Sequence, residues 1–420
     1  MSAEARSRLT DLFNLPAAER QPLAWSFACF FSILCAYFLL RPIRDEMAIV
    51  AGPENIPDLF LGTFVLVLLT VPAFGWVTKR LPRRVFLPGI FAFFIVNLLL
   101  FFWIFGIGSI DRVWPARAFF VWLSVFNMFI VALFWSFMVD LYEEDQARRL
   151  FGYIAAGGSV GAILGPTLTA ALVGELGLRM LFLLAAGLLC VALVCVVRLL
   201  AWARANARPE RPVNDTRPLG GAVLDGVRLV FSDGYLGKLA ALMLVGTFCG
   251  TALYLYQAEL LSGYSSDSTS RTRLLAGMDI AINTLTLALN LFVARAAFRR
   301  FGVGRVLLLL PVLTLAGLIV LIVAPGVTVI VVLQVLRRGL NFGLNVPAKE
   351  TIYTVVSPDA KYKAKNFIDV SLVRGADVLS SQTVRLMQTL AGAFAPVAVF
   401  CAPHTTDSAT QKTATGAKAP

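Results

Sequence analysis

Long apolar runs separated by short polar segments make up most of this chain. A membrane-spanning helix needs about 20 consecutive apolar residues. Runs of that kind fall near 23–41, 59–78, 85–105, 118–138, 151–173, 180–200, 238–258, 274–294, 304–324, 327–346 and 367–388. A last apolar piece, 389–402, is too short at about 1.5 Å per residue to cross a hydrocarbon core of about 30 Å. The pattern therefore predicts eleven spans and a truncated twelfth.

The longest polar interruption, 201–236, divides these spans into two sets of six. We expect an N-terminal segment at 1–22, bundles at 23–200 and 237–402, and a disordered tail at 403–420. Three residues recur at a common offset of 214, Asp145, Ile154 and Gly161 matching Asp359, Ile368 and Gly375. Two parallel repeats are the plan of major facilitator transporters, whose substrate site lies between the halves. The expected fold is therefore an all-α polytopic membrane protein of the major-facilitator kind, with a short last helix.

The composition agrees with a protein that is embedded in the lipid bilayer. Apolar residues make up 58% of the chain and charged residues 15%, against about 25% charged in soluble proteins. A net charge of +12 would suggest nucleic acid as the partner of a soluble protein. Here we attribute it to Lys and Arg retained in cytoplasmic loops, and we expect no nucleic-acid partner.

Basic residues also predict the orientation of the chain. They gather after the second, sixth, eighth and tenth spans, for example at Arg83 and Arg84 and in the run Lys361, Lys363 and Lys365. The positive-inside rule then places both termini and the central loop in the cytoplasm. The first apolar run lacks a cleavage site, so we expect no removable signal peptide. We expect the protein to lie in a bacterial-type inner membrane as a multi-pass protein.

The first apolar run closes with a charged stretch at residues 37–46. It contains Arg41, Pro42, Arg44, Asp45 and Glu46. Tyr37, Arg41 and Arg44 would share one face of a continuing helix, and Asp45 could pair with Arg41 one turn away. These charges could be interfacial anchors that snorkel into the headgroups. Alternatively, they form a cationic, partly braced site for an anion in a polar cavity.

Four later spans contain polar residues at helical spacing. The stripes are Thr247, Thr251 and Tyr254 in the seventh span, Asp279, Asn283, Thr286 and Asn290 in the eighth, Gln334, Arg338, Asn341 and Asn345 beside Arg337 in the tenth, and Arg374 and Asp377 in the eleventh. Lipid cannot satisfy such groups, so they should face the bundle interior or water. Polar packing between helices is one explanation. Two adjacent arginines within a span favour the other, which is an anionic ligand.

Three short motifs resemble the ATP/ADP translocase (nucleotide transporter) family of plastids and intracellular bacteria. Asn345-Val-Pro347-Ala-Lys349-Glu350 followed by Lys361-Tyr-Lys363-Ala-Lys365-Asn-Phe-Ile368-Asp369 is similar to that family's Pro-Thr-Lys-Glu run, lysine run and Ile-Asp pair. Residues 40–45 resemble its Leu-Arg-Asp-Thr-Lys-Asp motif, and 134–137 its Phe-Trp-Gly-Phe. The resemblance implies a major-facilitator fold and transport of nucleotides, often as ATP/ADP exchange. Residues 75–84 also resemble, in degenerate form, the basic signature between the second and third helices of major facilitators.

This chain matches the family at some functional positions and differs from it at others. The functional lysine of the family's first motif falls on Arg44, and the glutamate of its Lys-Glu motif on Glu350. A second functional glutamate falls on Gln146. That departure leaves open the transport of another phosphorylated or anionic metabolite. Gly161-Ala-Ile-Leu-Gly165-Pro166 resembles the Gly-Pro motif of the fifth major-facilitator helix, and would serve equally as a small-residue packing seam.

We expect a secondary transporter that alternates access around a basic cavity. The expected substrate-binding residues are Arg41, Arg44, Asp279, Asn283, Arg337, Arg338, Asn341 and Arg374. The expected gating or coupling residues are Asp45, Glu46, Lys349, Glu350, Asp369 and Asp377. A proton-coupled carrier of another anion and a non-transporting membrane sensor are the alternatives. The chain has no Walker phosphate loop, nucleophile elbow or metal-ligand cluster, so we expect no enzyme activity, metal or cofactor. Its oligomeric state stays open.

Overall fold

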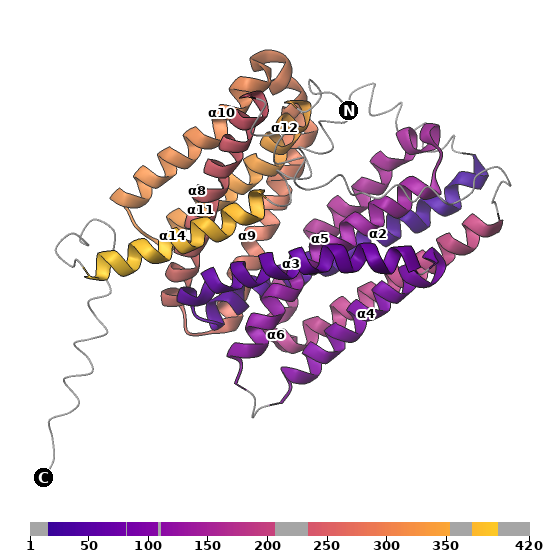
Figure 1. Ribbon diagram of the computed structural model, residues 1–420, viewed down its shortest axis with the longest axis horizontal. Coiled ribbons are helices and arrows are strands. Elements are labelled where there is room, and N and C mark those ends of the chain that lie inside the picture. Colours follow the sequence, from indigo (N-terminus) through magenta and orange to yellow (C-terminus); the bar gives the residue numbers. More distant parts are fainter. Residues whose placement is uncertain (1–15, 81, 108–110, 206–233, 353–371, 394–420) are drawn as a thin grey trace, which may run out of the picture.

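A computed structural model describes residues 16–80, 82–107, 111–205, 234–352 and 372–393, and the regular elements in these ranges are helical (Figure 1). The first part of the chain forms α2 (Ala17–Val50), η1 (Pro53–Asn55), α3 (Ile56–Arg80), α4 (Arg83–Ile104), α5 (Val113–Leu141) and α6 (Glu144–Ala205). The second part forms α8 (Gly234–Tyr264), α9 (Ser268–Ala288), η2 (Leu289–Val293), α10 (Ala294–Val323), α11 (Val327–Leu340), η3 (Asn341–Asn345), α12 (Val346–Ile352) and α14 (Val373–Ala393).

Two of the long helical stretches turn sharply at a glycine. Gly177 within α6 and Gly302 within α10 have φ angles of 73° and 76°, a left-handed conformation that glycine adopts without steric cost. Eight described helical stretches are long and apolar enough to cross a membrane. The two glycine turns fall at the boundaries between the fifth and sixth and the eighth and ninth expected spans.

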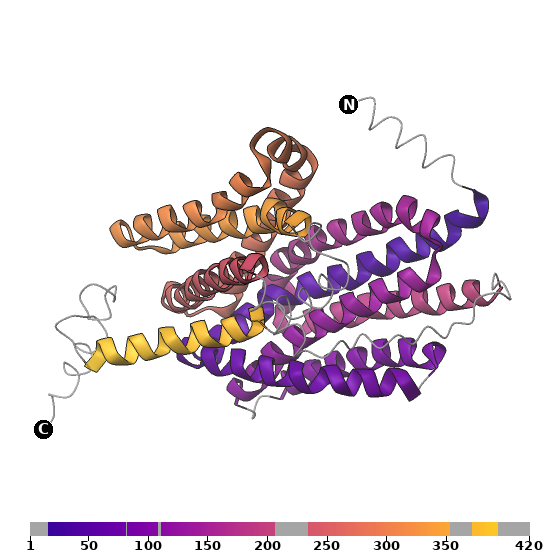
Figure 2. The same cartoon turned by 45° about the horizontal axis from the view of Figure 1, so that its top comes forward.

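The helices form two groups that pack side by side. Figures 1 and 2 show the indigo-to-magenta helices α2–α6 on one side and the red-to-orange helices α8–α12 on the other. The yellow helix α14 lies along α3 and α8. α2 and α9 contact helices of both groups, so residues on these two helices can join the halves. The described elements therefore confirm the all-α part of the expected fold class.

The contact between α2 and α6 depends on a row of glycines. A Cβ atom at Gly161 or Gly165 would lie 2.5 Å from a carbonyl oxygen of α2. Thr169, one turn further on, donates a hydrogen bond to the carbonyl of Leu39 at 2.7 Å. The packing interpretation of the Gly161–Pro166 motif is therefore confirmed, because these small residues let the two helix backbones touch.

The expected end of the first span at residue 41 is wrong. α2 continues through Pro42 to Val50, so the charged stretch lies inside a helix and not at its end. Four expected features lie wholly or partly outside the described residues: the last span beyond Ala393, the central loop from 206 to 233, the lysine run and Asp369.

Candidate functional site

Charged side chains from both halves meet around the second half of α2. We call six of them the central charge cluster: Arg41, Arg44 and Asp45 on α2, Asp279 on α9, and Arg337 and Arg338 on α11. Asp45 and Asp279 are buried, and the four arginines are partly buried. Ionised groups at this depth mark functional sites in membrane proteins, because lipid cannot solvate them.

The two arginines of α2 have different partners. Arg41 Nη1 lies 3.4 Å from Asp279 Oδ1, a contact between the halves. Arg44 donates two hydrogen bonds to Asp45 Oδ1, from Nε at 3.0 Å and Nη2 at 2.6 Å. The expected pairing of Arg41 with Asp45 is therefore wrong. The adjacent Arg44 occupies that carboxylate, and α9 supplies the counter-ion of Arg41.

Tyr254 ties α8 to this network. Its hydroxyl donates to Asp45 Oδ1 at 3.1 Å, and its ring lies 5.9 Å from the guanidinium carbon of Arg338. Arg44 lies over the ring of Phe120 on α5 at 5.2 Å. Aromatic faces stabilise neighbouring guanidinium groups without neutralising them.

Within the described part of the chain, the two arginines of α11 form no direct ion pair with a carboxylate. Arg338 is within electrostatic range of Asp45 and Asp279 but forms no hydrogen bond or ion pair with a described residue. Arg337 donates to Gln334 Oε1 at 3.2 Å, a neutral acceptor. Gln334 in turn donates to Gln257 on α8 at 2.9 Å.

The formal charge of the cluster is positive. Four arginines against two ionised aspartates leave +2, with the excess on α11. Two buried polar atoms in the cluster, Arg41 Nε and Asp279 Oδ2, have no hydrogen-bond partner in the described part of the chain. An anion placed beside Arg338 would be attracted by this excess and could accept charge-assisted hydrogen bonds.

A second contact between the halves is made by the residue of α2 that follows Asp45. Glu46, which has 0% of its surface exposed, accepts hydrogen bonds from Arg271 Nε at 3.0 Å and Nη2 at 2.6 Å. Ser268 Oγ donates to the same carboxylate at 2.6 Å. Both donors come from the first turn of α9, so this α2–α9 ion pair fastens the halves together.

Asp267 holds the start of α9 in position. Its carboxylate caps the helix by accepting from the backbone N–H groups of Thr269 and Ser270. The Ser270 hydroxyl bond and these backbone bonds lower the pKa of the Asp267 carboxyl. The cap therefore stays charged at neutral pH and orients the turn that presents Ser268 and Arg271.

The remaining expected residues lie in several places. Asn283 donates to the carbonyl of Ala162 on α6 at 2.8 Å, which is a packing contact in this structure. Asn341 accepts from Asn345 at 3.1 Å within the π-helical segment η3. Two further results concern gating candidates: Lys349 lies 3.2 Å from Met243 Sδ, and Glu350 is exposed on α12.

Arg374 and Asp377 form a separate pair on α14. Arg374 Nη1 lies 3.5 Å from Asp377 Oδ2, and Thr251 on α8 donates to Asp377 Oδ1 at 2.8 Å. This pair is neutral overall, so it adds no excess charge. It links α14 to α8 within the second half.

The structure tests one of the two interpretations of the charged stretch of α2, while the anion-site interpretation stays a prediction. Asp45 and Glu46 are 5% and 0% exposed and contact α8 and α9, so the interfacial-anchor interpretation is wrong. Sequence reasoning did not include Tyr254, Arg271 or Gln257 among the site residues. Tyr254 belongs to the polar stripe of the seventh span, and Gln257 is a polar group within the same apolar run, a signal that could have identified both as site residues.

Comparisons with known proteins identify the family. The sequence profile of the Major Facilitator Superfamily matches residues 26–363, most of the chain. The chain belongs to the Major Facilitator Superfamily. This superfamily member is accordingly a multi-pass membrane transporter. No curated protein sequence matches it.

Solved structures of other transporters share the fold of this superfamily member. A variant of the nucleoside transporter NupG has a TM-score of 0.63 at 14% identity, over 87% of this chain and 90% of that one. A bacterial homologue of the iron transporter ferroportin, in an inward-facing state, has a TM-score of 0.59 at 12% identity, over 88% and 91%. At such identities the likeness shows the fold alone.

Proposed function

We propose that this transporter carries an anionic metabolite across the inner membrane by alternating access, with a nucleotide as the substrate. The observation that supports this most is the formal charge of +2 in the central charge cluster, which lies between the two halves. Arg338, which has no ion-pair partner among the described residues, would hold the anionic group together with Arg41. Guanidinium groups match the geometry of phosphate oxygens.

The choice of a nucleotide as the substrate depends on the sequence motifs that resemble those of the ATP/ADP translocases. Arg44 keeps the positive charge of the lysine in the family's first motif, and it lies in the cluster. Gln146, the position of a missing glutamate, donates to Glu19 Oε1 at 3.1 Å. A glutamate at 146 would place two carboxylates side by side, so Glu19 makes the amide the better residue here.

Two interactions would govern the exposure of the site. The α2–α9 ion pair of Glu46 and Arg271 closes one end of the boundary between the halves. The longer contact of Arg41 with Asp279 lies deeper in the bundle. An alternating-access cycle must break and remake such contacts, because they join helices that move relative to each other.

Uptake into proteoliposomes tests the proposal. Vesicles loaded with ADP should accumulate labelled ATP, and a panel of sugar phosphates and organic anions should show whether nucleotides are preferred. Arg338→Gln should lower the apparent substrate affinity roughly tenfold or more, as expected for the loss of a hydrogen bond to a charged group. Arg305→Gln, a change of an exposed arginine on α10, is the matched control. Transport of another anion without any transport of nucleotides would contradict a nucleotide substrate, but would still support an anionic substrate.

A proton-coupled carrier of another anion is the second candidate. It is favoured by Asp279 Oδ2, a buried carboxylate oxygen without a described donor, which could hold a proton. Uptake driven by an imposed pH gradient, and abolished in Asp279→Asn, would support proton coupling over exchange. Binding of a nucleotide without any flux would instead support a membrane sensor.

A further inference from the structure

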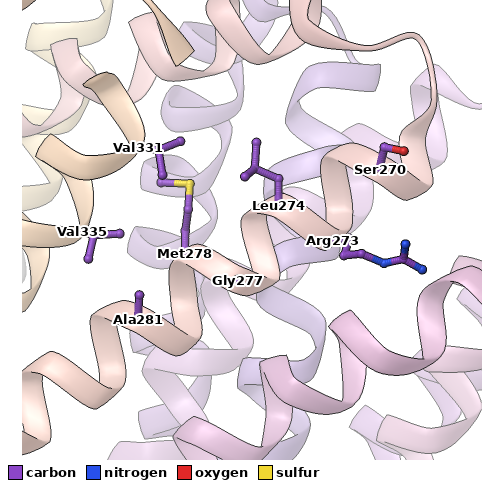
Figure 3. Close-up of a pocket in the computed structure, with 8 residues that line it drawn as sticks. All are labelled: Ser270, Arg273, Leu274, Gly277, Met278, Ala281, Val331 and Val335. Atoms are coloured by element: carbon purple, nitrogen blue, oxygen red, sulfur yellow. The ribbon is translucent and has the colours of Figure 1, made fainter. Parts of the chain in front are cut away.

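A groove on the outside of α9 has a different character from the central charge cluster. It has a volume of about 410 Å³ and runs between α9 and α11 (Figure 3). Met278, Val331 and Val335 form its apolar side. Gly277 and Ala281, one turn apart on α9, are exposed along its length. A Cβ atom at Gly277 would meet nothing within 4 Å, so the groove is open at that point.

One end of the groove is basic. Arg273 lines it, is exposed, and forms no hydrogen bond or ion pair with any residue that the structure describes. Figure 3 shows this side chain extending from α9 away from Val331 and Val335. Its guanidinium lies against Gly174 of α6, so a larger side chain at 174 would require Arg273 to move. The groove therefore lies where the two halves of the transporter meet.

The surroundings of the groove determine what can fill it. Arg273 is five residues from the first residue of α9, or about 8 Å along the helix axis, which is near the headgroup boundary of a bilayer. The apolar part extends from there toward the interior of the membrane-spanning stretch. Water in the apolar part of the groove would lack hydrogen-bond partners, so a hydrocarbon chain is the more favourable occupant. A phosphate group could accept charge-assisted hydrogen bonds from Arg273.

We infer that this groove binds one phospholipid with a net negative headgroup. The phosphate pairs with Arg273, and an acyl chain lies along Gly277 and Ala281. Bound there, the lipid contacts α9 and α11 of one half and, through Arg273, α6 of the other. Its presence then affects how readily the halves separate.

Native mass spectrometry of the full chain, released from bilayers of phosphatidylglycerol and phosphatidylcholine, tests this site. The wild-type protein should retain a single phosphatidylglycerol. Arg273→Gln should bind it roughly tenfold more weakly, the effect expected for losing a hydrogen bond to a charged group. Gly277→Leu fills the trough and should also lose the lipid while keeping Arg273. Arg305→Gln removes an exposed arginine outside the groove and should retain it.

Three results would overturn the inference. Equal weakening by Arg273→Gln and Arg305→Gln would mean general attraction to anionic lipid. Full retention in Gly277→Leu would show that the acyl chain lies elsewhere. Equal retention of phosphatidylcholine would contradict a requirement for negative charge. None of these results depends on which substrate the transporter carries.

Discussion

The α2–α9 ion pair of Glu46 and Arg271 provides a sharp test of how the halves are held together. Removing one member of a buried ion pair costs about 3–5 kcal/mol, because the other charge stays buried without its partner. The side chains of Glu46 and Arg271 are 0% and 9% exposed, so the full penalty applies to both. We expect Glu46→Gln and Arg271→Gln each to lower the free energy of unfolding by about that amount.

The double variant separates the ion pair from general damage. Two glutamines can bond to each other and leave no unpaired charge, so the loss in Glu46→Gln/Arg271→Gln should be smaller than the sum of the single losses. The expected coupling is about 2 kcal/mol, within the usual range for residues in contact. The free energy of unfolding is measured for each variant in detergent by titration with denaturant.

A natural control is present in the same boundary. Arg385 on α14 and Asp58 on α3 form an ion pair at 2.8 Å, but their side chains are 47% and 53% exposed. Exposed pairs contribute at most about 1 kcal/mol. Additive losses in the double variant, or a loss in Arg385→Gln as large as in Arg271→Gln, would refute the reasoning.

The same substitution should shift the balance between conformations. A loss of about 3 kcal/mol from one state alone changes its population ratio by roughly 100-fold, since about 1.4 kcal/mol is tenfold. Ala48, which is buried on α2 beside the pair, can report this change as a single cysteine. Its reaction with a membrane-impermeant maleimide should accelerate in Arg271→Gln and remain slow in Arg385→Gln.

Three further predictions concern the centre of the bundle. Gly165→Leu should lower the free energy of unfolding by about 1–3 kcal/mol, because the new side chain would meet the backbone of α2. Gly187→Ala is the control: a Cβ atom there meets nothing within 4 Å, so this variant should melt at the same temperature as the wild type. Arg41→Gln should lower folded yield in size-exclusion chromatography, and Asp279→Asn in the same chain should recover part of it, because both charges of one pair are then gone. Tyr254→Phe should cost about 1.5 kcal/mol in a melting assay, because its hydroxyl donates to a buried carboxylate.

Hydropathy predicted the helical membrane fold but could not predict where the first helix ends. Hydropathy averaged over a short stretch of sequence drops where the charges begin near residue 41, so it predicts that the span ends there. In the structure α2 continues to Val50 because α8 and α9 supply partners for Asp45 and Glu46. Those partners are more than 200 residues away in the sequence. A local pattern contains no information about them.

The candidate site shows the same division. Helical spacing correctly indicated that Asp279 and Arg338 face away from lipid, because the periodicity of polar residues can be read from one helix alone. Pairing is a property of two helices, so spacing alone suggested Asp45 as the partner of Arg41 and missed Asp279. Arg271 was missed for a related reason: it lies at a helix start, where a basic residue has no unusual local signature.

The unequal lengths of the ion pairs suggest how binding and opening could be linked. Arg44 holds Asp45 with two hydrogen bonds of 3.0 and 2.6 Å. The contact between Arg41 and Asp279 is 3.4 Å long, and each of these residues has one buried polar atom without a partner among the described residues. The contact of Arg41 with Asp279 is therefore the weaker one, and it joins the halves. An anion bound between Arg41 and Arg338 would compete with Asp279 for Arg41. Because a ligand shifts a conformational equilibrium only by its differential affinity, this competition gives the substrate a means to loosen α2 from α9.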